Sequence, residues 1–168
     1  SNLVAGDAIG TFDIFIKNLE TGSVQLVDTT GISDFGIESD DSYNDLSFSP
    51  DGTKIVFSNQ SVTSSFFKHD IFTKDLVSGE IALINATQEG VRVISNSYLP
   101  SFSPDGSKVL FESFVENLTP GGEAASIFIK DTISGTLTAV DSRLYDDDDD
   151  VSFSPHFSPD GNSVMFGS

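Results

Sequence analysis

The sequence predicts an all-β protein built from repeated units, and two signatures that recur in phase are the basis of this prediction. The segment Phe-Ser-Pro-Asp-Gly occurs at residues 48–52, 102–106 and 157–161, in steps of 54 and 55 residues. A second signature, Asp/Ser-Ile-Phe-x-Lys-Asn/Asp, begins at Asp13, Asp70 and Ser126, in steps of 57 and 56 residues. A unit of about fifty residues that holds several strands is typical of a β-propeller blade. The expected fold is therefore a propeller of four-stranded antiparallel blades.

One complete unit shows how each blade is expected to be built. Residues 45–49 are predicted as a first strand, which is followed by a Ser-Pro-Asp-Gly turn in which proline fixes the backbone and glycine accepts a positive φ. The second, third and fourth strands are expected at 54–59, 70–76 and 80–85, with a loop at 60–69 and an Asx-type turn between the last two strands.

The two ends of the chain each match half of this unit. The expected divisions are a half blade with a third and fourth strand, two whole blades, and a half blade with a first and second strand, at residues 1–28, 45–85, 99–141 and 154–168. Three blades' worth of repeats are too few to close around an axis. We expect either that the segment is part of a longer propeller or that copies join head to tail, in which case two copies would form a six-bladed ring.

Composition excludes some classes of partner. The chain holds 26 acidic and 8 basic residues, for a net charge of −18. Nucleic acid and anionic membranes are therefore not expected as partners, because binding to phosphate requires clustered Lys and Arg. The absence of cysteine excludes a disulfide framework and thiolate metal sites, although it does not decide the compartment.

The paired signatures resemble the WD40-like (PD40) repeat of TolB-type propellers, and they are similar to the propeller repeats of prolyl oligopeptidases. This resemblance covers nearly the whole chain. Residues 1–7, followed by Asp13-Ile14-Phe15, resemble more narrowly the repeats of large secreted bacterial proteins that often carry calcium-binding modules. The resemblance implies a periplasmic or extracellular propeller. The resemblance does not identify a ligand, because propeller folds occur in both binding proteins and enzymes.

The long irregular segments are expected on the propeller face opposite the short turns. Variable loops on a rigid scaffold are where function usually lies. These segments are residues 29–44, 60–69, 86–97, 113–125 and 142–152.

Acidic residues suggest a calcium site in this loop face. Of the 26 acids, 12 lie between residues 28 and 45 or between 141 and 150. Dense carboxylate oxygens suit Ca²⁺, but a solvated acidic loop that keeps the protein soluble is the alternative, since successive Asp residues lack the alternating spacing of a calcium loop. The first candidate ligands are Asp146, Asp147, Asp148, Asp149 and Asp150.

Asp7 and Asp13 form a second candidate site for calcium. In the secreted repeats that this stretch resembles, an Asn commonly stands where this chain has Ile9, so a third oxygen ligand is absent. A tight turn that leads into a strand is the alternative interpretation.

Catalysis by this chain is not expected. Nucleophile elbows, phosphate loops and His-Glu-x-x-His motifs are all absent, and His69 and His156 share no motif. Asp51, Asp105 and Asp160 recur inside the turn and are interpreted as turn residues. The expected function is a non-catalytic binding or scaffold module whose acidic loop face meets a protein, a glycan or calcium. The alternative is the propeller accessory domain of a hydrolase or lyase whose catalytic residues lie elsewhere.

Overall fold

The computed structural model describes residues 4, 13–27, 29, 39–63, 66–93, 96–114, 118, 126–141 and 152–168. These residues form antiparallel sheets without a helix, so the all-β prediction is confirmed, and no helix that could span a membrane occurs among them. Two of the sheets have four strands in the order of the chain. The first contains β3 (Ser39–Phe48), β4 (Lys54–Thr63), β5 (Phe66–Asp75) and β6 (Ile81–Leu83); the second contains β7 (Ser97–Phe102), β8 (Lys108–Ser113), β9 (Ile127–Asp131) and β10 (Leu137–Ala139).

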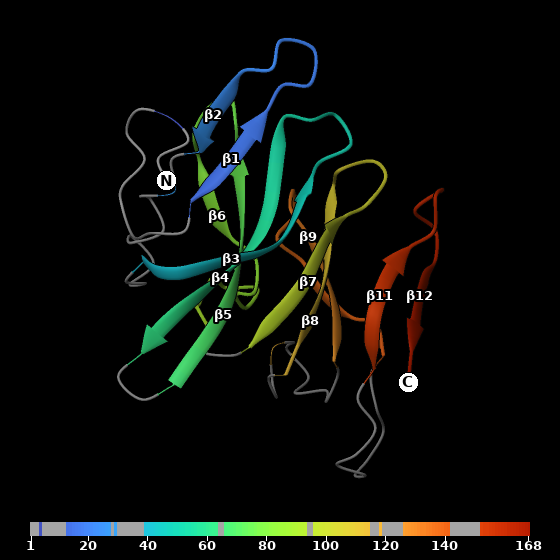
Figure 1. Cartoon of the computed structure of the whole chain (residues 1–168). Helices are drawn as coiled ribbons and strands as arrows, with labels where there is room; N and C mark the ends of the chain where they lie inside the picture. The colour runs from blue at the N-terminus through green and yellow to red at the C-terminus, as the bar shows by residue number, and fades with distance from the viewer. Residues whose placement is uncertain are drawn as a thin grey trace.

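The other two sheets have two strands each. They are β1 (Ile14–Lys17) with β2 (Val24–Val27), and β11 (Phe153–Phe157) with β12 (Val164–Gly167). Figure 1 places these two-stranded sheets on opposite sides of the complete blades. The first strands of the blades, β3, β7 and β11, are called the inner strands. They contact the neighbouring sheets: β7 packs against β3, β4 and β5, and β11 packs against β7 and β8. The sheets form an open array that does not close into a ring.

The Ser-Pro-Asp-Gly segments form superimposable hairpin turns, as predicted. In the first turn, the Gly52 N–H donates to the Ser49 carbonyl at 2.9 Å and Gly52 adopts a φ of 71°. Equivalent hydrogen bonds close the other two turns, where Gly106 and Gly161 have φ values of 75° and 72°. A residue without a Cβ is favoured at these positions because φ is positive.

The predicted Asx turns between the third and fourth strands are also present. The side-chain oxygens of Asn18, Asp75 and Asp131 each accept hydrogen bonds from the backbone N–H groups two and three residues later. These turns are short and are satisfied by their own side chains, so the turn face of each blade is determined by local sequence.

Two apolar clusters lie between the sheets. One joins the two complete blades and contains Val56, Ile71, Phe102, Phe111 and Phe128 among its buried residues. The other joins β1–β2 to the first complete blade and contains Ile14, Val27, Ile55, Phe57 and Phe72. Within each blade, a stacked phenylalanine pair joins the second and third strands. Burial of these faces against neighbouring sheets supplies the main favourable term for the fold.

Two expected loops are partly strand. The segment 60–69 was expected as a loop, but β4 extends to Thr63 and β5 begins at Phe66, and their ladder continues through the pair Gln60↔His69. Val62, Thr63, Phe66 and Phe67 favour extended structure, which explains the longer hairpin. The expected loop 29–44 is also shorter, since β3 begins at Ser39.

Replacing Gly52 with Val is expected to destabilise the protein by about 1 kcal/mol or more, because a β-branched residue resists positive φ. A Cβ at Gly52 would meet no atom within 4 Å, so the effect would come from the backbone conformation alone. Gly52→Asn is the matched control, since Asn tolerates this region better. Thermal unfolding measures both variants, and an unchanged Tm in Gly52→Val would contradict the turn assignment.

Candidate functional site on the inner strands

Each inner strand contains one residue in the left-handed region at an equivalent position. These residues are Asp45 (φ 53°), Leu99 (φ 51°) and Ser154 (φ 54°), and the pairing register shifts beside each of them. Such a conformation costs a non-glycine residue of the order of 1–3 kcal/mol and is concentrated at functional sites. The bulges therefore make the inner strands a candidate for a functional site.

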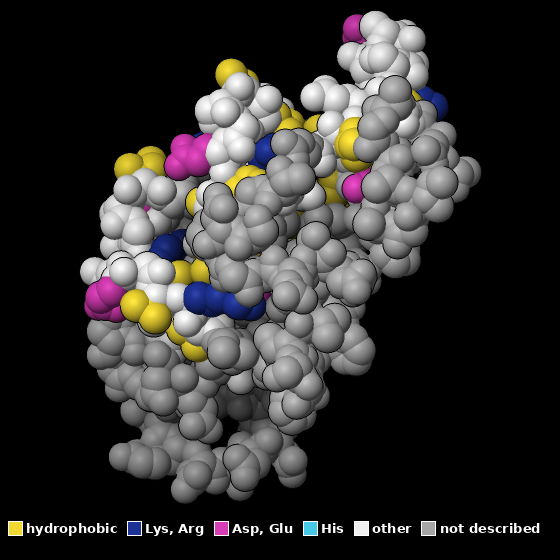
Figure 2. Space-filling model, turned by 90° about the vertical axis from the view of Figure 1, so that its left-hand side faces the viewer, with side chains coloured by type: hydrophobic (Ala, Val, Ile, Leu, Met, Phe, Trp, Pro, Cys, Tyr) yellow, Lys and Arg dark blue, Asp and Glu magenta, His cyan; other side chains and the backbone are white. Residues whose placement is uncertain are grey.

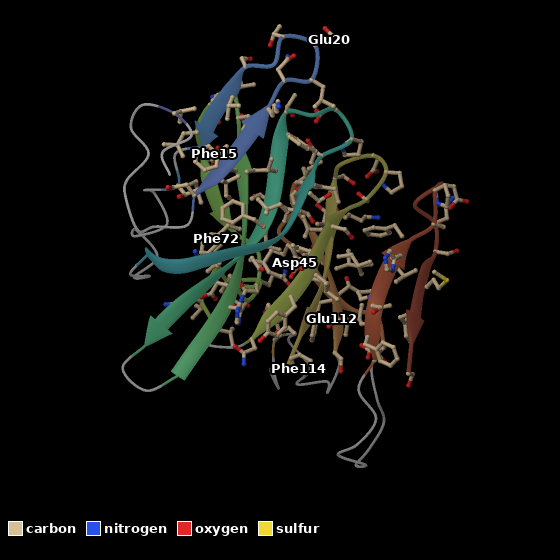
Figure 3. The ribbon with its side chains drawn as sticks, viewed as in Figure 1. Phe15, Glu20, Asp45, Phe72, Glu112 and Phe114 are labelled. Atoms are coloured by element: carbon tan, nitrogen blue, oxygen red, sulfur yellow. The ribbon has the colours of Figure 1, made fainter. Side chains whose placement is uncertain are left out.

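Two carboxylates bind the backbone at these bulges from the preceding blade. The Leu99 N–H donates to Asp45 Oδ2 at 3.2 Å, and the Ser154 N–H donates to the Glu112 carboxylate. The same kind of contact thus occurs at two successive junctions between blades. Figure 3 labels both residues: Asp45 lies on the inner strand β3, and Glu112 lies on β8, the second strand of the next blade.

The Glu112 carboxyl lies in an unusual electrostatic environment. The residue is only 6% exposed, whereas Asp45 is exposed to solvent. Burial raises the pKa of the Glu112 carboxyl above its ordinary value, and the negative charge of Asp45 raises it further, against the opposing effect of the Ser154 N–H. A cation that approached this pair would be attracted by both carboxylates.

An aromatic row lies next to the carboxylates. The His69 and Tyr98 rings are 4.6 Å apart, and the Tyr98 and Phe114 rings are 6.1 Å apart in an edge-to-face arrangement. Burial raises the pKa of the Tyr98 hydroxyl. Phe114 is 55% exposed and Leu99 is 40% exposed, so apolar surface borders the acidic pair. The arrangement combines negative charge with accessible apolar side chains.

The turn aspartates are engaged within their own turns. Each carboxylate accepts hydrogen bonds from the serine hydroxyl two residues before it and from the backbone N–H two residues after it. The serine bond, followed by the backbone bond, lowers the pKa of Asp51, Asp105 and Asp160 to about 2. Their interpretation as turn residues is confirmed.

Asp141 also has a structural role, although it was grouped with the acidic loop residues. Its carboxylate accepts hydrogen bonds from the Ser126 and Ile127 N–H groups at the start of β9. In the other complete blade, the side-chain oxygen of Asn85 accepts a hydrogen bond from the Ile71 N–H. In both complete blades, an Asx residue after the fourth strand thus accepts a hydrogen bond from an equivalent backbone N–H of the third strand.

Only one of the predicted calcium ligands lies among the residues that the structure describes. Asp7 and Asp146, Asp147, Asp148, Asp149 and Asp150 lie outside the described residues. Asp13 is described and lines a groove beside β1 with Ile14 and Phe48. Among the described residues, no group of three His, Asp or Glu side chains is placed to hold a metal. Calcium binding by this chain stays a prediction.

Glu112 and the bulges were not predicted from the sequence. Asp45 was predicted at the start of a strand and lies in β3, but its left-handed conformation was not predicted. One feature of the repeats could have indicated Glu112. The equivalent residues of the other repeats are Ser58 and Gly167, so only this repeat places a carboxylate in its second strand, which is otherwise mostly buried. Asp45, Leu99 and Ser154 each precede the phenylalanine of the turn signature by three residues. Their shared conformation has no shared residue type, so sequence alone does not indicate it.

The comparisons with known proteins support the fold. No protein-family model and no curated protein matches the sequence. TolB from Acinetobacter baumannii has a similar structure, with a TM-score of 0.54 and 21% identity over 92% of this chain and 31% of that chain. The Kuenenia stuttgartiensis hydrazine synthase is also similar, with a TM-score of 0.58 and 18% identity over 92% of this chain and 43% of that chain. The tricorn protease has a TM-score of 0.53 and 17% identity over 74% of this chain and 12% of that chain.

These similarities define a class of fold. The segment has a TolB-like β-propeller fold, in agreement with the resemblance of its repeats. It spans less than half of the length of each of these structures, and identities below 25% concern the fold alone. The narrower assignment of the repeats to PD40 stays a prediction.

Glu112 provides a test of the inner-strand electrostatics. A carboxyl whose pKa is raised in the folded state makes the protein lose stability as pH rises from the ordinary pKa of 4.5 through the folded value, because the folded state then holds the proton more tightly. Glu112→Gln keeps an acceptor for the Ser154 N–H without the charge. We expect this variant to have a higher Tm than the wild type at pH 7 and a similar Tm at acidic pH.

Glu112→Ala is the companion variant, since it leaves the Ser154 N–H without its partner and should lower Tm at both pH values. Thermal unfolding at several pH values measures all three proteins. A Glu112→Gln variant that is less stable than the wild type at pH 7 would show that the fold requires the charged carboxylate.

Proposed function

We propose that this chain is a non-catalytic binding module of a periplasmic or extracellular propeller protein, and that its inner-strand surface binds a polypeptide segment with basic and apolar side chains. The observation that carries the proposal is the placement of Asp45 and Glu112 beside exposed Leu99 and Phe114. The location outside the cytoplasm rests on the resemblance of the repeats to TolB-type and secreted repeats.

The chemistry of the surface favours a polypeptide as ligand. Protein interfaces commonly combine aromatic or aliphatic contacts with charge complementarity, and the latter chiefly provides specificity and rapid association. Lys or Arg would pair with the exposed Asp45, and an apolar side chain would cover Phe114. The net charge of −18 would also attract a basic segment from a distance.

The opposite, turn-bearing face is a weaker candidate for ligand binding. The carboxylates of Asp51, Asp105 and Asp160 are held by hydrogen bonds within their turns, as are those of Asp75 and Asp131. A ligand would have to replace these internal bonds. This arrangement supports binding on the inner strands and a scaffold role for the turns.

Three matched synthetic peptides test the proposal by fluorescence polarisation: one basic and apolar, one basic and polar, and one acidic and apolar. Only the first is expected to bind well. Asp45→Asn and Phe114→Ala should each weaken its binding by about threefold to tenfold, that is, by about 0.6 to 1.4 kcal/mol.

The control variants change similar side chains away from the site. Glu20→Gln removes an exposed acid in the β1–β2 turn, at the opposite end of the molecule from Phe114 in Figure 3, and Ile133→Ala trims an 84% exposed side chain. Both should bind as the wild type does. Equal binding of the two basic peptides, or equal losses in site and control variants, would overturn the proposal.

A further inference from the structure

The aromatic row and the exposed acid of the candidate site meet at one position on β7. Tyr98 is the middle residue of the row, because its ring lies 4.6 Å from the His69 ring and 6.1 Å from the Phe114 ring. The next residue along the strand, Leu99, donates its N–H to Asp45 Oδ2 at 3.2 Å. A single peptide unit therefore separates the middle ring from the backbone group that holds the acid.

Glu112 also belongs to the surroundings of Tyr98. The two residues are directly opposite each other in the β7–β8 ladder, and opposite residues of an antiparallel pair have Cβ atoms about 4.5–5.5 Å apart. Burial, and then the negative charge of Asp45, raise the pKa of the Glu112 carboxyl, so the two acids influence each other. The Tyr98 ring thus lies where acidic groups from two strands favour a cation.

Asp45 attracts a cation but discriminates poorly between basic side chains. Its Oδ2 atom accepts hydrogen bonds from the Leu99 N–H and, at 3.5 Å, from the Ser58 hydroxyl. A ligand is therefore expected to approach mainly through Oδ1. A contact through one oxygen suits an ammonium as well as a guanidinium, whereas arginine gains its advantage at a carboxylate when two oxygens accept in parallel.

The aromatic row supplies the discrimination that the carboxylate lacks. A guanidinium is planar and more weakly hydrated than an ammonium, and it stacks on aromatic faces. Tyr98 is half-buried and lies between two other rings, so its side chain loses little freedom when a ligand contacts it. A ring that is fixed beside an exposed carboxylate favours arginine over lysine.

We propose that the basic side chain selected by this surface is an arginine, whose guanidinium stacks on the Tyr98 ring and pairs with Asp45 while the neighbouring apolar side chain packs on Phe114. Because it rests on the proposed function, this assignment concerns the same surface and names the side chain that the surface selects. Tyr98 then determines specificity, and Asp45 contributes to the affinity for either basic side chain. Lysine keeps the ion pair but stacks less well, so it binds more weakly.

Fluorescence polarisation with three forms of the basic and apolar peptide tests this preference on the 168-residue chain. The single basic position of the peptide holds arginine, lysine or citrulline, which has the shape of arginine without its charge. The arginine peptide is expected to bind about threefold to tenfold more tightly than the lysine peptide. The citrulline peptide is expected to bind most weakly, because it forms no ion pair with Asp45.

Variants of the site separate stacking from charge. Tyr98→Leu removes the ring and should reduce the affinity for the arginine peptide to that for the lysine peptide, whereas Tyr98→Phe keeps the ring and should retain the preference. Asp45→Asn should weaken the binding of both basic peptides by a similar factor. Phe15→Leu is the matched control, since Figure 3 shows Phe15 on β1, away from Phe114. On the side of the molecule shown in Figure 2, where β1–β2 lies, basic, acidic and apolar side chains all reach the surface.

Proton NMR of the peptides bound to the wild-type chain gives a second measurement that requires no variant. Stacking on the Tyr98 ring should shift the Cδ protons of the arginine upfield, because the ring current shields protons above the ring face. The Cε protons of the bound lysine should shift less.

A preference for arginine that Tyr98→Leu abolishes, and that Tyr98→Phe and Phe15→Leu retain, would support the proposal. Equal binding of the arginine and lysine peptides to the wild type would overturn it and leave the proposed function standing. So would a preference that survives Tyr98→Leu, or bound arginine protons without an upfield shift, because the ring would then not contact the guanidinium. If neither basic peptide binds, the arginine assignment and the proposed function both fail.

Discussion

The packing of one sheet face against the next is the constraint on which this structure depends. Each blade directs alternate side chains toward its two neighbours: Phe57 of β4 contributes to the cluster with β1–β2, whereas Val56 contributes to the cluster with the following blade. A sheet with a neighbour on both faces therefore buries nearly all of its second strand. Phe48 and Met165, the counterparts of the buried Phe102 and Val56, are exposed.

The candidate binding surface is a consequence of the same stacking. Adjacent inner strands approach closely enough for a carboxylate of one unit to accept a hydrogen bond from the bulged backbone of the next, as Asp45 does for Leu99. The bulges direct these N–H groups toward the preceding blade, and Leu99, at one of the bulges, is 40% exposed. The candidate surface thus combines the inner strands β3 and β7 with Glu112 of β8 and Phe114, which follows β8.

The sequence predicts the fold well because its determinants are local and repeated. Turn chemistry and strand patterning place the hairpin at Gly52 and the pairing of Phe57 with Phe72 within one unit. The candidate site depends on contacts between units, which sequence periodicity does not specify. Glu112 and Ser154 are 42 residues apart, and the left-handed positions are occupied by Asp, Leu and Ser, so neither distance nor residue type indicates their roles.

Hydrogen exchange of the second strands tests most directly whether packing between sheet faces holds the fold together. The amides of β4 and β8 should exchange slowly, because their side chains are buried against neighbouring sheets, and Phe102→Ala should speed exchange in β4 of the neighbouring blade as well as in its own blade. Exchange in β4 that Phe102→Ala leaves unchanged would show that each blade is stable without its neighbour and would contradict this account.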